Sequence, residues 1–212
     1  EYAIHARRKG GMEAEEEILL DCNERAAGHA WYALGGYEIS DDHCYLEIAE
    51  DTLSRGLYQV RILDIKRGRY LPEVIEGAAP YLAWSADGYD LFYLEKHPET
   101  LLAYRLMRHR RGTDSSDDIL VYEERDNRFY TSLGRSRSRD YIFLYHYSTE
   151  TTEVQLLPAG RPRARIQPFL PRQAGHEYDI DHAAGMFYIR SNADAVNFRV
   201  LCASPEAAAD MS

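Results

Sequence analysis

The sequence predicts an all-β fold, an incomplete β-propeller of about four antiparallel four-stranded blades. Short runs of alternating apolar and polar residues dominate the chain, and each run ends in a polar turn. The composition includes 17 Tyr against 6 Phe and 2 Trp, and aromatic side chains suit half-buried pleated surfaces. The same polar turn recurs at a period close to the roughly 40–50 residues of a propeller blade. A sandwich would share the short strands but would not need this period.

The length and charge of the chain are compatible with this fold, and the charge argues against a nucleic-acid-binding protein. The 212 residues carry 25 Lys and Arg against 35 Asp and Glu, so the formal net charge is 25 − 35 = −10. That length can bury a sizeable core. The acidic balance argues against nucleic-acid binding, which concentrates Lys and Arg on one face. No long amphipathic helix interrupts the strands, so a parallel βαβ sheet is disfavoured.

The chain divides into consecutive units, the first of which is the end of a blade. We place the units at residues 1–36, 37–80, 81–128, 129–174 and 175–212. In the first unit and at the start of the second we expect strands over Tyr2–Arg7, Ile18–Asp21 and Trp31–Ser40, with a helical turn at Asn23–Ala27. In the second we expect strands over Cys44–Glu50, Leu57–Ile65 and Tyr70–Ile75.

The later units repeat this arrangement. The third has strands over Tyr81–Ser85, Tyr89–Leu94, Tyr104–His109 and Ile119–Tyr122. The fourth has strands over Phe129–Leu133, Tyr141–Tyr147 and Glu153–Leu157. The fifth has strands over Tyr178–Asp181, Met186–Arg190 and Phe198–Leu201.

Four polar turns occupy equivalent places at the ends of first strands. They begin at Ser40, Ser85, Ser136 and Asp181, which gives spacings of 45, 51 and 45 residues. Four units do not complete a larger ring, and the chain begins with Glu1 rather than Met, so we expect a segment of a longer protein. The open sheet edges of an incomplete ring favour self-association of the segment.

No nucleophile motif is present. The G-x-S-x-G elbow of α/β-hydrolases does not occur in the chain. Ser, His and Asp are all present, but any chain with 8 His contains them, so we assign no catalytic residue.

The segment His176–His182 resembles a metal motif only superficially. The two histidines are six residues apart, whereas H-E-x-x-H requires one helical turn. On a strand they would lie roughly 20 Å apart on one face, at ~3.3 Å per residue, too far to hold one zinc. A blade strand with a polar turn is the favoured interpretation, and we assign no metal or cofactor.

Paired charges also have structural explanations. Glu123 and Glu124, near Asp126, could suggest a glycosidase pair, but adjacent strand residues point to opposite faces. Arg135, Arg137 and Arg139 alternate on one face, and a second basic run covers Arg108–Arg111. Solvated turns or ion pairs with neighbouring carboxylates are the favoured interpretation of both runs.

Compartment signals point to the cytoplasm. Cys22, Cys44 and Cys202 are odd in number and widely spaced, which is typical of a reducing compartment without disulfides. No Asn is followed by x-Ser/Thr, and neither a membrane span nor a signal peptide is apparent.

Many short motifs, in order and spacing, resemble oligopeptidase B (protease II) of the prolyl oligopeptidase family of serine peptidases. The resemblance covers nearly the whole chain. It rests on Glu1–Ile4, Leu19–Asp21, Ala49–Asp51, Trp84, Leu91–Tyr93, Lys96–Leu101, Tyr104, Arg108–His109, Gly112–Thr113, Val121–Glu124, Arg125–Asp126, Phe129–Tyr130, Ser148–Val154, Phe169–Arg172, His176–Tyr178, Asp181–His182, Phe187–Asn192 and Asn197–Phe198.

The resemblance implies a function for the parent protein. Family members combine a seven-bladed propeller with a C-terminal α/β-hydrolase domain that carries the Ser, Asp and His and the acidic residues that bind basic side chains. No position here matches those residues. This chain would then be a gating segment that admits short peptides cleaved after Arg or Lys, with the parent's own hydrolase domain as partner. The alternative is a free-standing propeller that serves as a protein-interaction platform.

Overall fold

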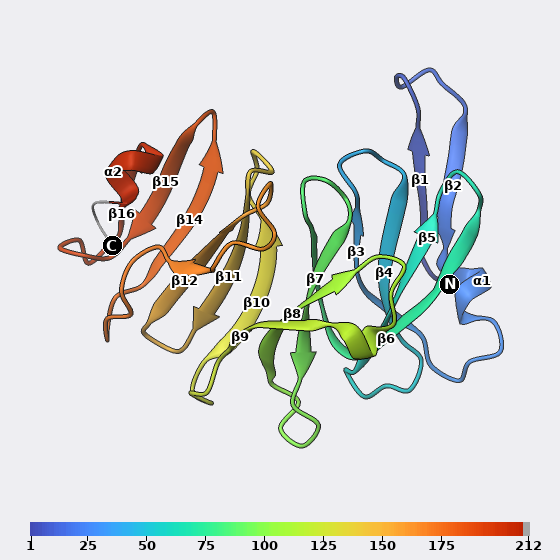
Figure 1. Cartoon of the computed structure of the whole chain (residues 1–212), viewed down its shortest axis with the longest axis horizontal. Coiled ribbons are helices and arrows are strands. Elements are labelled where there is room, and N and C mark those ends of the chain that lie inside the picture. The colour runs from blue at the N-terminus through green and yellow to red at the C-terminus, as the bar shows by residue number, and fades with distance from the viewer. Residues whose placement is uncertain (210–212) are drawn as a thin grey trace.

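The computed structural model describes residues 1–209 and the side chains of residues 1–207. Its antiparallel sheets stand side by side in a row, with the N-terminus at one end and the C-terminal sheet at the other (Figure 1). No helix among the described residues is long and apolar enough to cross a membrane. The thiols of Cys22, Cys44 and Cys202 are all free.

The first sheet is a two-stranded hairpin. Strand β1 (Ile4–Arg8) pairs with β2 (Glu16–Asp21), and the five-residue helix α1 (Cys22–Ala26) follows directly. Asp21 caps this helix because its carboxylate accepts a hydrogen bond from the Asn23 backbone N–H. The sequence predicted both strands and the helical turn, with ends displaced by one or two residues.

The second sheet has seven strands and contains two blades. Its strands are β3 (Ala33–Ile39), β4 (Tyr45–Asp51), β5 (Tyr58–Asp64), β6 (Arg69–Trp84), β7 (Asp90–Lys96), β8 (Ala103–Arg110) and β9 (Ile119–Glu123). A one-turn 3-10 helix, η1 (Ser115–Asp117), precedes β9.

The long strand β6 belongs to both blades. Its first part pairs with β5 as far as Ala78, and its last part pairs with β7 through Leu82–Trp84. The sequence predicted two separate strands here, and that prediction is wrong. The pairing partner changes from β5 to β7 at a register irregularity between Ala78 and Leu82, and the strand continues through it without a break. We call β3–β5 with the first part of β6 blade 1, and the last part of β6 with β7–β9 blade 2.

Two further sheets complete the row. Blade 3 contains β10 (Tyr130–Arg135), β11 (Tyr141–Tyr147), β12 (Thr152–Pro158) and β13 (Gln167–Pro168). Blade 4 contains β14 (Tyr178–Ala183), β15 (Met186–Ser191) and β16 (Arg199–Ala203), and helix α2 (Pro205–Ala209) follows. The unit boundaries placed at residues 36, 80, 128 and 174 stay predictions.

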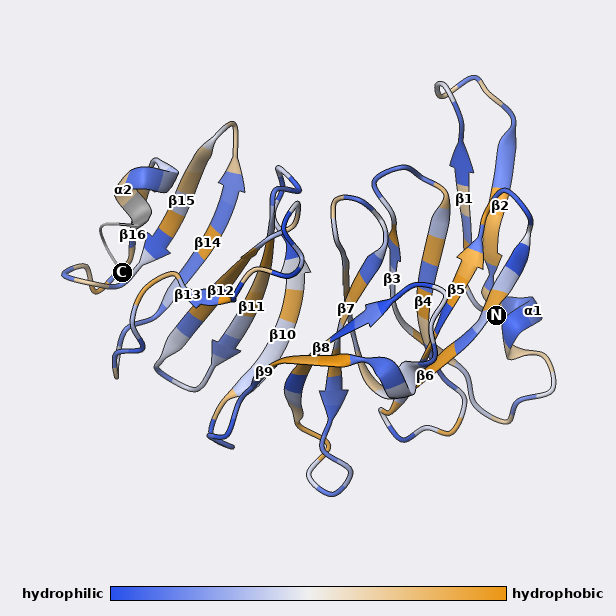
Figure 2. Ribbon diagram, viewed as in Figure 1, coloured by the Kyte–Doolittle hydropathy of each residue, from blue (hydrophilic) through white to orange (hydrophobic). Residues whose placement is uncertain are grey.

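The hydrophobic core lies between neighbouring sheets. Middle strands are buried on both faces, and they appear as bands of alternating hydropathy in Figure 2. In β11, Leu144 packs against blade 2, whereas the adjacent Phe143 packs against blade 4. Blades 1 and 2 share another core around Trp84, and blade 1 packs on the first hairpin around Ile48. Each sheet is therefore held by contacts with the sheet or sheets next to it in the row.

Candidate functional site

Three of the turns after first strands have the same construction. Ser40, Ser85 and Ser136 each accept a hydrogen bond of 3.0 Å from the backbone N–H five residues later. Ser40 and Ser85 each donate 2.6 Å bonds to an aspartate two residues later, and Ser136 contacts the Ser138 hydroxyl at 3.0 Å in the same place. Each serine hydroxyl makes two hydrogen bonds within its own turn, so these serines stabilise the turns.

The fourth turn is built differently, and the predicted equivalence of Asp181 is wrong. The turn between β14 and β15 has only two residues, Ala184 and Gly185, at φ angles of 49° and 76°. Both angles are typical of a type I′ hairpin. Asp181 lies inside β14, where its carboxylate accepts a 2.9 Å hydrogen bond from the Arg137 backbone N–H of blade 3.

Asp41, in the turn after β3, forms ion pairs with two arginines from blade 3. The Arg135 guanidinium lies 3.2 Å from the Asp41 carboxylate and donates to the Trp84 carbonyl of blade 2. The Arg139 guanidinium also contacts Asp41, and it donates a 3.2 Å bond to the Ile39 carbonyl. Three consecutive blades are therefore joined at one point, which we call the Asp41 clasp (Asp41, Arg135 and Arg139).

The expectation that three arginines share one face is wrong. The Arg135 side chain is only 4% exposed, and burial lowers its pKa. The Arg137 side chain is 81% exposed and does not join Asp41. Its Nε atom lies 3.4 Å from the Asp181 carboxylate instead. The interpretation as ion pairs is confirmed for all three residues. In the second basic run, Arg110 pairs with Asp90 at 3.2 Å, and Arg111 lies over the Tyr45 ring at 3.7 Å.

A pair of glutamates lies close to the clasp. Glu38 on β3 faces Glu47 on β4 directly across the strand pair. Glu47 is completely buried, and neither of its carboxylate oxygens has a hydrogen-bond partner among the described residues. Burial raises the pKa of Glu47 well above its ordinary value, and the charge of Glu38 raises it further. Burial also raises the pKa of Glu38, although Arg139 and Arg135 oppose that shift.

The Ser138–His182 contact does not form a catalytic triad. The Ser138 hydroxyl lies 2.7 Å from Nδ1 of His182, and the Asp140 carboxylate lies 3.5 Å from the same nitrogen. A triad needs the serine and the acid on opposite ring nitrogens. Nε2 of His182 has no partner among the described residues, and the ring packs on Tyr141 and Phe187. The contact therefore joins blades 3 and 4.

The rings of His176 and His182 contact different serines, Ser191 and Ser138. Nε2 of His176 lies 2.8 Å from the Ser191 hydroxyl, which also accepts a bond from the Ala193 backbone N–H. No group of three or more His, Cys, Asp or Glu residues suited to a metal occurs in the part of the chain that the structure describes. His176 therefore contacts the residue that ends β15 of blade 4, whereas His182 contacts the turn between β10 and β11 of blade 3.

Glu123 and Glu124 point to different partners, as the strand alternation predicted. Glu123 accepts a 2.9 Å bond from Arg105. Glu124 accepts a 2.5 Å bond from Arg172, and its carboxylate lies 3.4 Å from Nδ1 of His146. Burial lowers the pKa of His146 to about 4, although the Glu124 charge opposes the shift. The nearby Arg128 holds the pKa of the half-buried Asp126 at about 2 through its side-chain hydrogen bond.

Another buried polar group, in blade 2, was not predicted from the sequence. Asp118 accepts a 2.9 Å hydrogen bond from the Tyr93 hydroxyl and lies 2.7 Å from Nδ1 of His109. Asp118 stood in a predicted loop, so no strand pattern indicated its burial.

Residues 1–210 match the family model described as the prolyl oligopeptidase N-terminal beta-propeller domain. The chain belongs to the prolyl oligopeptidase family. That assignment confirms both the resemblance and the prediction of a partial propeller from a peptidase family.

Relatives of this propeller include curated peptidases. The chain is 39% identical to dipeptidyl aminopeptidase BI of Pseudoxanthomonas mexicana over 96% of its length, and 29% identical to protease 2 of Moraxella lacunata over 95%. It spans 30% of the length of each of these two relatives.

Solved structures share the propeller architecture. Oligopeptidase B from Leishmania major matches 99% of the chain with a TM-score of 0.87 and 25% identity. Oligopeptidase B from Trypanosoma brucei matches 99% with a TM-score of 0.86 and 24% identity. The chain covers 30% of each of these structures.

Proposed function

We propose that this propeller is the substrate-gating part of a cytoplasmic serine oligopeptidase that cleaves short peptides after Arg or Lys. The observation that carries the proposal is the match of 99% of the chain to oligopeptidase B at a TM-score of 0.87. The identity of 29% to protease 2 adds support. The catalytic serine, aspartate and histidine would belong to a hydrolase domain, the partner of this propeller in the same protein.

The proposed role is exclusion of large substrates. A rigid propeller beside an active site blocks folded proteins, whereas a short flexible peptide can pass when the domains separate. The net charge of −10 would accelerate the approach of cationic peptides. Salt screens this attraction, so the gain should fall as ionic strength rises.

The test uses protein expressed from the complete reading frame. We expect cleavage of a short Arg-Arg peptide, inhibition by a serine-directed reagent, and no cleavage of the same site inside a folded domain. The ratio kcat/KM for the peptide should fall between low and high salt. Equal cleavage of the folded domain would refute gating, and a preference for an uncharged residue before the cleaved bond would refute the specificity.

A second candidate is dipeptidyl aminopeptidase activity, which the 39% identity to dipeptidyl aminopeptidase BI favours. An enzyme of this kind releases dipeptides from a free amino end. A matched pair of peptides, one with a free and one with an acetylated amino terminus, separates the two candidates. An endopeptidase cleaves both peptides, whereas a dipeptidyl aminopeptidase cleaves only the free one.

The remaining alternative is a propeller without a hydrolase domain that serves as an interaction platform. A G-x-S-x-G motif in the same reading frame would exclude it. The family assignment weighs against it, because the matched model is the N-terminal domain of a peptidase.

A further inference from the structure

A pocket of about 530 Å³ lies between blades 3 and 4. Tyr141 and Leu156 of blade 3 and Phe187 of blade 4 line it, together with Phe169 after β13. Pro168 and Pro205 contribute further apolar surface. The pocket therefore offers aromatic and proline surface to an apolar side chain.

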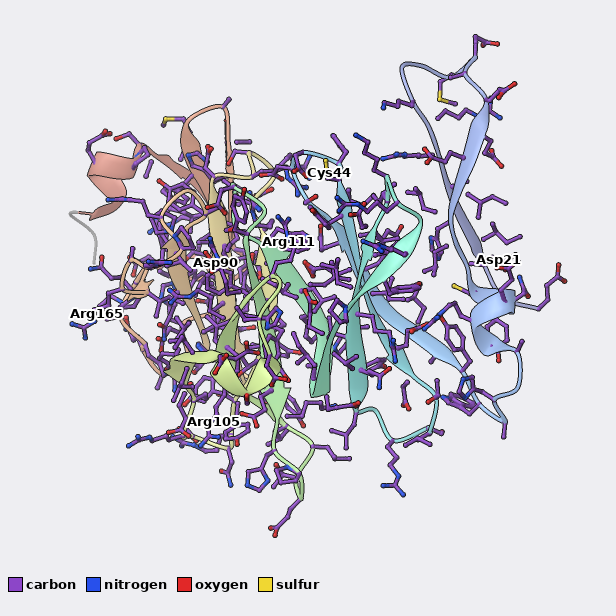
Figure 3. All side chains as sticks on the ribbon, turned by 45° about the vertical axis from the view of Figure 1, so that its right-hand side comes forward. Asp21, Cys44, Asp90, Arg105, Arg111 and Arg165 are labelled. Carbon is purple, nitrogen blue, oxygen red and sulfur yellow. The ribbon has the colours of Figure 1, made fainter. Side chains whose placement is uncertain are left out.

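Three exposed arginines belong to the loop between β12 and β13 beside this pocket. Arg161 and Arg165 line the pocket, and Arg163 lies between them in the sequence. Figure 3 shows Arg165 at the outer edge of the molecule. No carboxylate of the described chain lies within salt-bridge distance of these three guanidinium groups, whereas most other arginines are paired. The loop is thus a local cluster of three arginines without an ion-pair partner in the described chain, on an acidic protein.

The backbone of this loop is firmly held. Ala159 donates to the Asp140 carbonyl at 2.8 Å and accepts from the Ala86 backbone N–H of blade 2 at 2.9 Å. The Pro162 carbonyl accepts a 3.0 Å bond from the Arg108 guanidinium. Ile166 at the far end is buried in the core between blades 2 and 3. The arginines are therefore presented from a fixed backbone, which lowers the entropic cost of binding.

We propose that this pocket and its three arginines bind an acidic peptide segment of a partner protein, with one aromatic or branched apolar side chain in the pocket. Arginine guanidinium groups pair with carboxylates, often in bidentate geometry. The apolar side chain would bury surface against the half-buried Tyr141 and Leu156 and the exposed Pro168, as anchor residues of interfaces do.

This inference is independent of the proposed peptidase activity. Three arginines without ion-pair partners repel the cationic peptides proposed as substrates, so the occupant differs from the substrate. A nucleic acid would also contact arginines through its phosphates, but the apolar pocket and the net charge of −10 favour a peptide.

The experiment measures fluorescence anisotropy of a labelled ten-residue peptide of Asp and Glu with one central Phe, added to the purified protein at low salt. We expect saturable binding that R161E/R163E/R165E weakens at least tenfold. The control R55E/K66E/R69E makes the same charge change at exposed positions of blade 1 and should alter binding less than twofold. Thermal melts of both variants establish that they remain folded.

Two further measurements test the apolar part of the site. A peptide with Ser in place of Phe should bind at least fivefold more weakly. A164W, which places a bulky ring at the pocket lining, should weaken the Phe peptide and leave the Ser peptide unchanged. Equal losses in the two triple variants, equal affinity for both peptides, or tighter binding of an oligouridylate would each overturn the proposal.

Discussion

At the scale of single residues, Asp41 is the carboxylate on which two arginines of another blade depend. Arg135 is nearly inaccessible to solvent, and its Nε atom has no hydrogen-bond partner in the described chain. A buried cation is costly unless a counter-charge and hydrogen bonds compensate it. The clasp is therefore sensitive to loss of its one carboxylate, since the Trp84 carbonyl offers only a dipole.

Asp41→Asn should destabilise the protein. The substitution keeps the size of the side chain but removes the only carboxylate hydrogen-bonded to the buried Arg135, so we expect a loss of about 3 kcal/mol in the free energy of unfolding. Urea denaturation at neutral pH measures the change. Arg137→Ala is the matched control, because that exposed ion pair with Asp181 should contribute less than about 0.5 kcal/mol. Equal effects of the two substitutions would contradict the buried role of the clasp.

Glu47 should make the protein less stable as pH rises. Its pKa is raised in the folded state, whereas the unfolded chain ionises near the ordinary value of 4.5. Above that value the unfolded state binds fewer protons than the folded state, so stability falls with pH until the folded pKa is passed. Glu47→Met removes the cost of burying an unpartnered carboxyl group, and we expect a gain of about 1–3 kcal/mol at pH 8.

The measurement compares urea melts of the protein and the Glu47→Met variant at pH 5 and pH 8. The gain in stability should be larger at pH 8 than at pH 5. Glu99→Met, at an exposed position, is the control and should show no such trend. A gain independent of pH would mean that Glu47 does not titrate in this range.

At the scale of elements, turns of two constructions connect first to second strands. The Ser40, Ser85 and Ser136 turns rely on a side-chain hydroxyl, whereas the fourth turn relies on backbone angles alone. Gly185 adopts a positive φ without steric cost, but Ala184 carries a β-carbon at φ 49°. The fourth turn is therefore strained at one residue.

Ala184→Asn should stabilise blade 4. Asn tolerates the left-handed region and is favoured with Gly in type I′ turns. We expect a gain of about 0.5–1 kcal/mol, visible as a higher Tm by circular dichroism. Ala86→Asn provides the control, because Ala86 lies in the Ser85 turn without a positive φ. If Ala86→Asn gave the same increase in Tm, backbone strain at Ala184 would not be the cause.

Most elements were predictable from the sequence because alternation is a local signal. The observed β11 coincides with the predicted strand Tyr141–Tyr147. Strand β13, with two residues, is too short to show any period. The continuity of β6 escaped prediction because a register irregularity resembles a turn in the sequence. The Asp41 clasp could not be predicted for another reason. Arg135 and Arg139 lie 94 and 98 residues from Asp41 in the sequence, so no local pattern links them.

At the scale of the whole molecule, the row of sheets has two ends that no other described sheet covers. At the first end, Ile4 and Ile18 on the hairpin are 53% and 59% exposed. At the other end, Val200 on β16 is 71% exposed. Exposed apolar strands of this kind template pairing with another chain.

The isolated 212-residue polypeptide should therefore self-associate. We expect a mean mass by light scattering that rises with concentration, because apolar strand surface is buried on contact. The double substitution Ile4→Lys with Ile18→Lys should reduce association. Leu53→Lys removes an even more exposed apolar side chain from a loop of blade 1 and should not reduce association. A constant monomeric mass at high concentration would contradict the prediction.

The same polypeptide should not hydrolyse peptides by itself. No described serine is paired with a histidine whose other nitrogen meets a carboxylate, as the Ser138–His182 contact illustrates. An arginyl ester incubated with the purified segment should remain intact, with or without a serine-directed inhibitor. Inhibitor-sensitive turnover would place the nucleophile within these residues.

The sharing of β6 by two blades restricts how this architecture can be rearranged. Because Arg69–Trp84 closes one blade and opens the next, no single cut between them yields two intact modules. A circular permutant opened inside β6 would lose ladder pairing on both sides, whereas one opened in the exposed loop around Glu99 would leave every strand whole. Recombination that shuffles blades between homologues should accordingly find its tolerated crossover points in such loops.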